Sequence, residues 1–248
     1  MGLRVGVDVG GTKISAGVVT SQGKILHWEK CPTPQRATAR VIFNTIVKTL
    51  TDLIRAEKLQ PHTLAGIGLG VPGIVNPHTR QILATPNIHL AGFPLREELA
   101  RKFPVPIAID NDVNVGLLGE KWLGSARQAK NVVGLFPGTG IGGAIIIHDK
   151  LYNGSHGAAA ELGHMIIDIK GPPCTCGNTG CLEALASRWA IERDIRAAIA
   201  NGERTIIFDL MQDNKGVIKS RFLKQAINQQ DPLIISILKR VAETLGKA

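Results

Sequence analysis

The chain contains one supersecondary pattern twice, and this repeat constrains its fold more than any other feature. In residues 3–19, a strand-like segment leads into Gly10-Gly11-Thr12-Lys13 and then into a second strand-like segment. Residues 132–147 repeat the pattern around the glycine-rich turn Gly138–Gly143. Glycine lets the backbone approach a phosphate closely, so two such hairpins could present two sets of backbone N–H groups to one polyphosphate. We therefore expect an α/β protein with two phosphate-binding turns.

The rest of the sequence fits alternating strands and helices in two α/β domains. With 248 residues, of which 44% are hydrophobic, the chain can bury a large core. We expect a small N-terminal domain over residues 1–118 and a larger domain with a metal-binding motif over residues 119–248. The residue pattern predicts strands at 25–31, 64–69 and 106–110, helices at 42–54, 95–103 and 112–123, and a final helix broken near Pro232.

The first glycine turn follows a carboxylate. Asp8 ends the first strand, where it could hold Mg²⁺ directly or through water, and Thr12 and Lys13 could donate hydrogen bonds to phosphate oxygens. Each turn on its own also fits an ordinary hairpin, because glycine is common in turns. The second turn is not a Walker A motif, since no Lys-Ser or Lys-Thr follows it. The occurrence of both turns in equivalent hairpins favours phosphate binding.

A second acidic segment, Asp110-Asn111-Asp112, lies where a predicted strand ends and a predicted helix begins. Chemistry in α/β folds is concentrated at such strand ends. A carboxylate here could accept the proton of a hydroxyl that attacks a phosphoryl group, a reaction in which positioning matters more than base strength. The same residues also fit a helix cap at Asn111 or Asp112, and both interpretations stay open.

The strongest local signal is the spacing His164-x9-Cys174-x-Cys176-x4-Cys181. Three thiolates and one imidazole form a closed tetrahedral zinc site, which leaves no position for a water ligand and therefore indicates structural zinc. The alternative is a group of buried, reduced cysteines beside an unrelated histidine. Cys31 is isolated and fits a plain core position.

Two glutamates flank this cluster. Glu161 lies three residues before His164, and Glu183 lies two residues after Cys181. Carboxylates fixed next to a rigid metal site are good acceptors for sugar hydroxyls, although solvated surface charge is the default for glutamate.

The net charge of +9 is compatible with nucleic acid, an anionic membrane, anionic small molecules or a basic surface of no special use. No run of five like charges occurs, which weakens the interpretation as a nucleic-acid binder. The sequence has no signal-peptide pattern and no long apolar segment. We expect a cytoplasmic protein that binds neither nucleic acid nor membranes.

These motifs resemble the ROK family of bacterial sugar kinases and sugar-responsive repressors, from Val5 to about Ala186. The resemblance implies an actin-like, ribonuclease-H-type fold of two α/β domains, with ATP and sugar bound in the cleft between them. Its motifs include Asp8–Lys13, Val71-Pro72-Gly73, Pro86-Asn87, Asn111-Asp112, Gly138–Gly143, Glu161-Leu162-Gly163-His164 and Cys174-x-Cys176-Gly177-x-x-Gly180-Cys181-Leu182-Glu183.

The resemblance also implies roles for single residues. Asp112 matches the catalytic base, and it contacts the sugar as well. His164 would hold zinc through one ring nitrogen and face the sugar with the other. The other implied sugar contacts are Asn87, Asn111, Glu161 and Glu183. The implied nucleotide contacts are Gly10, Gly11, Thr12 and Lys13, with Asp8, Thr139 and Gly140.

Glu161–Met165 followed by the Cys-x-Cys-Gly sequence is most similar to the glucokinase branch. This branch implies transfer of phosphate from Mg²⁺-ATP to glucose, a step of carbohydrate metabolism and glycolysis, by a homodimer or homotetramer. N-acetylglucosamine, mannose and fructose kinases share most of these residues, and polyphosphate-dependent kinases share the turns. Family repressors carry a helix-turn-helix domain before the first turn, which here ends at Lys13, so we do not expect a DNA-binding regulator.

The sequence departs from the family in length. Members usually continue for several dozen residues, with a glycine-rich loop that contacts adenosine and a last helix that packs on the N-terminal domain. No Gly-Gly-Gly sequence occurs in residues 205–248. We therefore expect that the C-terminal part of the fold is missing, which leaves open a fragment, a short form, or a sugar-binding remnant without turnover.

Overall fold

The computed structural model describes residues 2–211 and 216–248. The chain divides into two compact units, which are described separately. Unit 1 comprises residues 1–134 and 144–160, and unit 2 comprises residues 135–143 and 161–248. Residue 118, the expected end of the first domain, lies within helix α3 (Asp112–Leu123).

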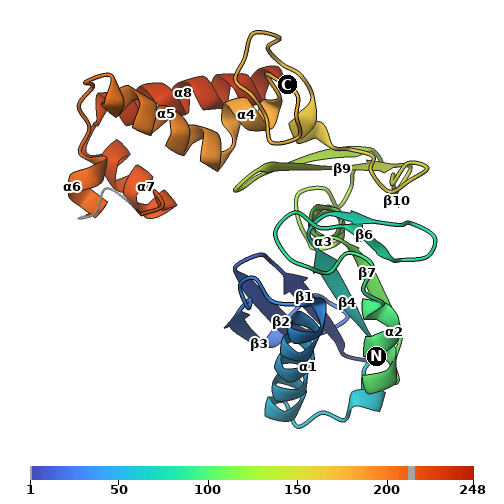
Figure 1. The fold of residues 1–248 in the computed structure, drawn as a ribbon. Coiled ribbons are helices and arrows are strands. Elements are labelled where there is room, and N and C mark those ends of the chain that lie inside the picture. The colour runs from blue at the N-terminus through green and yellow to red at the C-terminus, as the bar shows by residue number, and fades with distance from the viewer. Residues whose placement is uncertain (1, 212–215) are drawn as a thin grey trace. The chain divides into compact units, whose positions relative to one another are not determined.

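Unit 1 is built on a five-stranded sheet (Figure 1). The first two strands form the expected hairpin, and β1 also pairs in parallel with β4, which pairs in parallel with β7. The carboxyl ends of β1, β4 and β7 therefore meet at one edge of the sheet. In spatial order the strands are β3 (Ile25–Pro32), β2 (Lys13–Val19), β1 (Arg4–Val9), β4 (Gly66–Val71) and β7 (Ile107–Asn111).

One face of this sheet is covered by α1 (Ala39–Ala56) and α2 (Leu95–Lys102). Residues alternate along β1, so Val5, Val7 and Val9 are buried in the core that includes both helices. The other face carries small residues such as Gly6 and Gly68, beside which a Cβ atom would meet nothing within 4 Å. This second face is therefore open.

Smaller elements connect the strands of unit 1. The short helix η1 (Pro61–Thr63) precedes β4, and a two-stranded antiparallel hairpin of β5 (Ile74–Val75) and β6 (Ile82–Ala84) follows it. Helix α3 follows β7 directly and packs against β4 and β7. The second hairpin belongs to a sheet with the order β10 (Lys150–Leu151), β9 (Ile141–Ile147) and β8 (Val132–Pro137).

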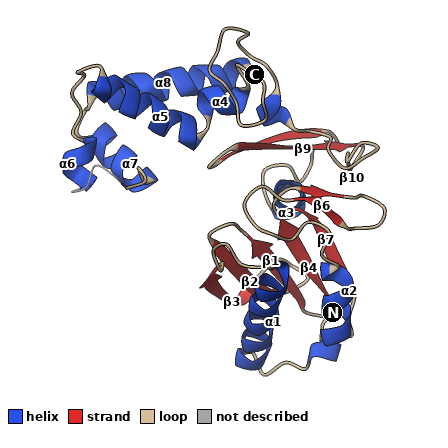
Figure 2. Cartoon of the chain, in the orientation of Figure 1, coloured by secondary structure: helices blue, strands red, loops and turns tan. Residues whose placement is uncertain are grey.

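The core of unit 2 is helical (Figure 2). Asp231 is buried and caps α8 by accepting a hydrogen bond from Ile234 N, and it also accepts from Thr205 Oγ1. The helices are η2 (Leu162–His164), α4 (Leu182–Ala186), α5 (Arg188–Ala200), α6 (Ile207–Met211), α7 (Ser220–Asn228) and α8 (Pro232–Lys247).

The predicted elements are present, with one correction. Both strand–turn–strand repeats form, α3 begins at Asp112, and the last helix is broken before Pro232. The turn expected over Gly138–Gly143 is shorter than predicted, because Ile141 to Gly143 belong to β9. Among the helices of residues 2–211 and 216–248, none is both long and apolar enough to cross a lipid bilayer.

Candidate active site

The first glycine turn of unit 1 is closed by its own backbone and braced by the end of β3. Gly10 N donates to Lys13 O at 2.9 Å, and Thr33 Oγ1 donates to Gly10 O at 2.6 Å. Thr33 N also donates to Thr12 O at 3.0 Å. These bonds occupy carbonyl oxygens of the turn, which is the arrangement expected of a loop that offers N–H groups to an anion.

Asn87 lies directly against this turn. A Cβ atom at Gly11 would lie 3.1 Å from the Cβ atom of Asn87, so a side chain at position 11 would force the two segments apart. Gln35 Nε2 fixes the same residue by donating to Gly11 O at 2.9 Å. The structure therefore brings together Asn87 and the Gly10–Lys13 turn, which are far apart in the sequence.

Asp8 stands at the edge where the parallel strands end. It pairs in register with Gly70 of β4, and Gly70 pairs with Asp110 of β7, so all three lie at one level of the sheet. Burial raises the pKa of Asp8, and the charge of Lys13 acts in the opposite direction. A carboxylate beside a glycine turn suits a hard cation, so Asp8 fits the Mg²⁺ role.

Asn111 is the helix cap of α3. Its Oδ1 atom accepts from Val113 N at 2.9 Å and Asn114 N at 3.1 Å, and its Nδ2 atom donates to Gly73 O at 2.9 Å. The capping alternative left open by the sequence therefore holds for Asn111, while its sugar contact stays a prediction.

Asp112, the first residue of α3, is partly buried next to β4. Gly70 makes this close approach possible, because a Cβ atom at position 70 would lie 3.3 Å from Asp112 Cα. Burial raises the pKa of Asp112, and the negative charge of Asp8 raises it further. Among the described residues, no lysine or arginine forms an ion pair with Asp112. It is therefore a carboxylate without an ion pair among these residues, and its pKa is higher than that of an ordinary aspartate.

A cavity of about 810 Å³ opens on the uncovered face of the sheet. Asp8, Asp110, Asp112 and Arg80 are its charged lining residues. Glycines and apolar side chains, including the exposed Trp28, form much of the remaining wall. The cavity places the proposed cation ligand and the proposed base in one space within unit 1.

The second glycine turn, in unit 2, is held by hydrogen bonds to residues that follow it later in the sequence. Glu183 Oε2 accepts from Ile141 N at 2.8 Å, and a Cβ atom at Gly140 would lie 2.2 Å from the same oxygen. The start of α5 supports the turn as well, since Arg188 N donates to Gly138 O at 3.1 Å and Trp189 N to Thr139 O at 3.4 Å. Glu183, which the sequence predicts as a sugar ligand, thus also contacts the turn, and no local motif indicates this contact.

The four predicted metal ligands come together in unit 2. The ligand atoms of His164, Cys174, Cys176 and Cys181 all lie within 4.8 Å of one another. Cys174 Sγ is 3.6 Å from His164 Nδ1, and the Sγ atoms of Cys176 and Cys181 are 3.7 Å apart. A tetrahedral zinc ion with bonds of about 2.3 Å to sulfur requires a sulfur–sulfur separation of about 3.8 Å. The donor set and its geometry therefore fit zinc.

Tight turns create this cluster. Cys174 N donates to Asn178 O at 2.7 Å, and Gly180, at φ 70°, would place a Cβ atom 1.5 Å from Asp168 O. Burial raises the pKa of the Cys181 thiol to about 12, whereas a backbone hydrogen bond from Asn178 lowers the pKa of Cys176.

The remaining predicted sugar ligands lie near the cluster. Glu161 is exposed and immediately precedes η2, and its carbonyl accepts from His164 N at 3.0 Å. Because Nδ1 of His164 faces Cys174, its Nε2 atom is the one left for a second partner.

These features define an α/β protein with two glycine-rich turns, a carboxylate without an ion pair among the described residues at the start of α3, and a Cys/His cluster whose geometry fits zinc. The chain matches the ROK family over residues 4–248 and belongs to that family. It is 34% identical to the glucokinase of Halalkalibacterium halodurans over 98% of this chain and 74% of that protein. It is also 32% identical to the xylose repressor of Caldicellulosiruptor bescii, over 99% of this chain and 61% of the repressor.

The fold agrees with this assignment. A ROK family glucokinase from Streptomyces griseus, solved in complex with glucose and AMPPNP, matches with a TM-score of 0.83 at 33% identity. The match covers 99% of this chain and 77% of that one. The expected actin-like ATPase fold is thereby confirmed, and the chain spans about three quarters of the length of these glucokinases.

Proposed function

We propose that this chain is a sugar kinase that transfers the γ-phosphoryl group of ATP to the 6-hydroxyl of glucose. The observation that carries the proposal is the cavity of unit 1, which is lined by both Asp8 and Asp112. The similarity to glucokinases, including one solved with glucose and AMPPNP, supports glucose and ATP as substrates.

Asp112 acts as the base in this reaction. As the sugar oxygen forms its bond to the γ-phosphorus, its proton passes to the Asp112 carboxylate, and the bond from phosphorus to the β,γ-bridging oxygen breaks. The products are glucose 6-phosphate and ADP. The raised pKa of Asp112 suits this task, because it brings the carboxylate closer to the pH at which the protein works.

The glycine turns hold the phosphates. In unit 1, phosphate oxygens would accept from N–H groups of the Gly10–Lys13 turn other than that of Gly10, which donates to Lys13 O, and from the side chains of Thr12 and Lys13. In unit 2, Thr139 and Gly140 would bind phosphate in the same way. Mg²⁺ held by Asp8 would neutralise charge that develops on the phosphate oxygens.

The proposed sugar ligands are Asn87 and Asn111 in unit 1, and Glu161, His164 and Glu183 in unit 2. Zinc bound to His164, Cys174, Cys176 and Cys181 would fix the His164 ring and would have no open position for chemistry.

A coupled assay with glucose, mannose, fructose and N-acetylglucosamine, each with ATP and with polyphosphate, tests the proposal. We expect sugar-dependent ADP release that is greatest with glucose and ATP. An intact, folded sample that releases no ADP with any of these sugars would refute it.

Similarity to xylose repressors favours a second candidate, a sugar-binding protein without turnover. Calorimetry with glucose on the same sample separates the two functions. Binding of glucose without any phosphorylated product would support the second candidate over the first.

A further inference from the structure

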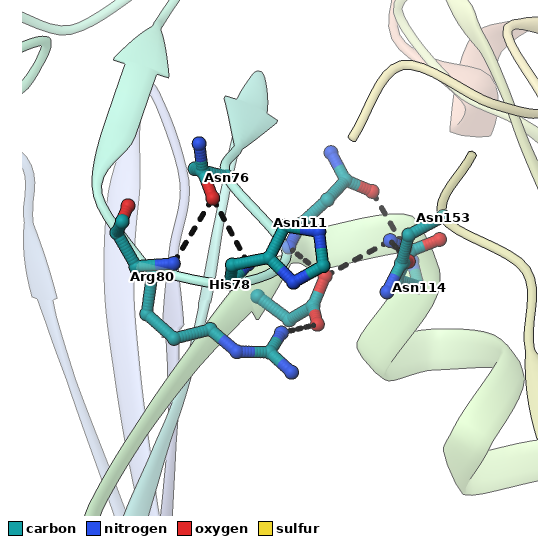
Figure 3. Close-up of polar contacts among 8 residues, drawn as sticks. Asn76, His78, Arg80, Asn111, Asn114 and Asn153 are labelled. Atoms are coloured by element: carbon teal, nitrogen blue, oxygen red, sulfur yellow. Dashed lines mark hydrogen bonds and ion pairs between the residues drawn. The ribbon is translucent and has the colours of Figure 1, made fainter. Parts of the chain in front are cut away.

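Arg80 occupies a turn position that favours glycine. It lies between β5 and β6 with φ 61°, in the left-handed region. The turn is built by Asn76, whose Oδ1 atom accepts from His78 N at 2.9 Å and Thr79 N at 3.0 Å (Figure 3). Arg80 N donates to Asn76 O at 2.9 Å. The backbone thus presents the Arg80 side chain from a fixed turn, in a conformation that most side chains disfavour.

The side chain of Arg80 pairs with Asp110. Its Nη1 atom lies 2.6 Å from Asp110 Oδ2, and Asp110 is the more buried partner, with 16% of its side chain exposed against 37% for Arg80. The other oxygen of Asp110, Oδ1, accepts from Asn111 N at 2.8 Å and from Asn114 Nδ2 at 2.9 Å (Figure 3). Both carboxylate oxygens of Asp110 are therefore occupied.

These bonds fix the start of α3. Asp110 holds Asn111 and Asn114, and Asn111 in turn caps the helix and donates to Gly73. Asn114 Nδ2 also lies 3.2 Å from Asn153 Oδ1. Asp112 is located inside this network, between two residues that Asp110 binds directly.

The pairing also distinguishes the three carboxylates of the cavity. Asp8 has the charge of Lys13 nearby, and Asp110 is neutralised by Arg80. Among the described residues, neither Asp8 nor Asp112 forms an ion pair, and Arg80 pairs with Asp110. Arg80 thus pairs with the carboxylate that holds the start of α3 and leaves the Asp112 carboxylate without a cationic partner.

We propose that Arg80 is a positioning residue of the phosphoryl-transfer reaction, which acts through Asp110 to hold the first turn of α3 and the base Asp112 in place. This inference rests on the proposed function. Arg80 takes no proton and contacts no reacting atom in this role. Its removal should therefore lower kcat more strongly than it weakens the binding of glucose.

Arg80→Gly is a sharp test, because glycine suits the backbone conformation and only the side chain is lost. A matched control is Lys58→Gly, since Lys58 also has a positive φ, of 52°, in a turn after α1. We expect Arg80→Gly to lower kcat by about 10- to 100-fold through misplacement of the base. The dissociation constant for glucose should change by a smaller factor than kcat, and the melting temperature should stay close to that of Lys58→Gly. Arg80→Lys should recover most of the lost kcat.

Two further measurements separate positioning from a general structural effect. In the Asp112→Asn background, Arg80→Gly should lower kcat no further, because the group that it positions is already gone. Amide hydrogen exchange at residues 111–114 should be faster in Arg80→Gly and unchanged in Lys58→Gly. Equal kcat and equal exchange in these two variants would overturn the inference.

The same assays report separately on the proposed function. If the unmodified chain phosphorylates no sugar, the proposed function fails, and the catalytic role of Arg80 fails with it. Hydrogen exchange then still decides whether Arg80 holds the start of α3. If the unmodified chain is active and Arg80→Gly is equally active, the inference about Arg80 alone is wrong.

Discussion

Glu183 Oε2 accepts a hydrogen bond of 2.8 Å from the backbone N–H of Ile141, 42 residues away in the sequence. Its other oxygen accepts from Thr175 Oγ1 at 3.4 Å, and Glu183 follows Cys181 by two residues in α4. One carboxylate therefore connects the second glycine turn to the Cys/His cluster. Both features belong to unit 2, so the Cys/His cluster and the second glycine turn are mechanically linked within it.

Gly140→Ala should disrupt this link, because the new Cβ atom would lie 2.2 Å from Glu183 Oε2. We expect the KM for ATP to rise by about tenfold, equivalent to about 1.4 kcal/mol and similar to the loss of one hydrogen bond to a charged group. Gly138→Ala is the matched control, since its Cβ atom would lie 3.9 Å from Gly140 O. Steady-state kinetics with varied ATP check the prediction, which is wrong if both variants behave alike.

Metal removal should loosen the same turn. Freshly purified protein is expected to hold about one zinc per chain, as a closed four-ligand site requires. Chelation should lower the melting temperature and speed hydrogen exchange at Ile141, because Cys181 is the N-cap of helix α4, to which Glu183 belongs. Metal analysis, thermal denaturation and mass-resolved exchange measure these effects.

The control for metal removal is Cys31→Ser. The Sγ atom of Cys31 lies 3.1 Å from Thr49 Oγ1 in unit 1, remote in sequence from the cluster, so this variant should keep its zinc. A zinc content far below one per chain in the untreated protein would count against the site.

Asp112→Asn should remove most turnover while the shape of the sugar pocket stays the same. Asparagine has the same shape, and its oxygen can still accept from Val113 N, which lies 2.9 Å from Asp112 Oδ1. We expect kcat to fall by about 10²- to 10⁴-fold, the usual contribution of a general base. Calorimetry should show nearly unchanged glucose binding. A variant with near-normal kcat would show that another group takes the proton.

Local signals in the sequence predicted much of the fold. The start of α3 at Asp112 could be predicted because an Asn-Asp pair after a strand is a strong capping signal. The ligand spacing likewise predicted the Cys/His cluster, whose atoms the structure brings within 4.8 Å. The glycines of β9 were placed in a turn by their local preference, but strand pairing overrides that preference.

The residues that support the site could not be predicted in the same way. Arg80 and Asp110 are 30 residues apart, and neither lies in a periodic pattern that relates them. The bond from Ile141 to Glu183 likewise depends on tertiary packing between distant segments. Side chains that position others carry no motif of their own, so their roles emerge only from the folded geometry.

Asp112→Asn should also change stability, in a direction set by the pKa of Asp112. Burial raises that pKa above 3.8 in the folded chain, so the folded state keeps its proton at pH values where the unfolded chain has lost it. The free energy of unfolding therefore falls as the pH rises from the pKa of Asp112 in the unfolded chain to its pKa in the folded chain. Above the folded pKa the full destabilisation by the buried charge is present. The asparagine variant lacks this penalty.

We therefore expect Asp112→Asn to melt at a higher temperature than the unmodified chain at pH 7. The difference should shrink as the pH is lowered through the folded pKa and should vanish below about 3.8, because the unmodified side chain is then neutral in both states. Melting curves of both proteins across this pH range, in the absence of Mg²⁺ and sugar, measure it. A difference in melting temperature that does not depend on pH would indicate a packing effect. A variant that is less stable than the unmodified chain at pH 7 would show that the Asp112 charge is stabilised by partners other than those described.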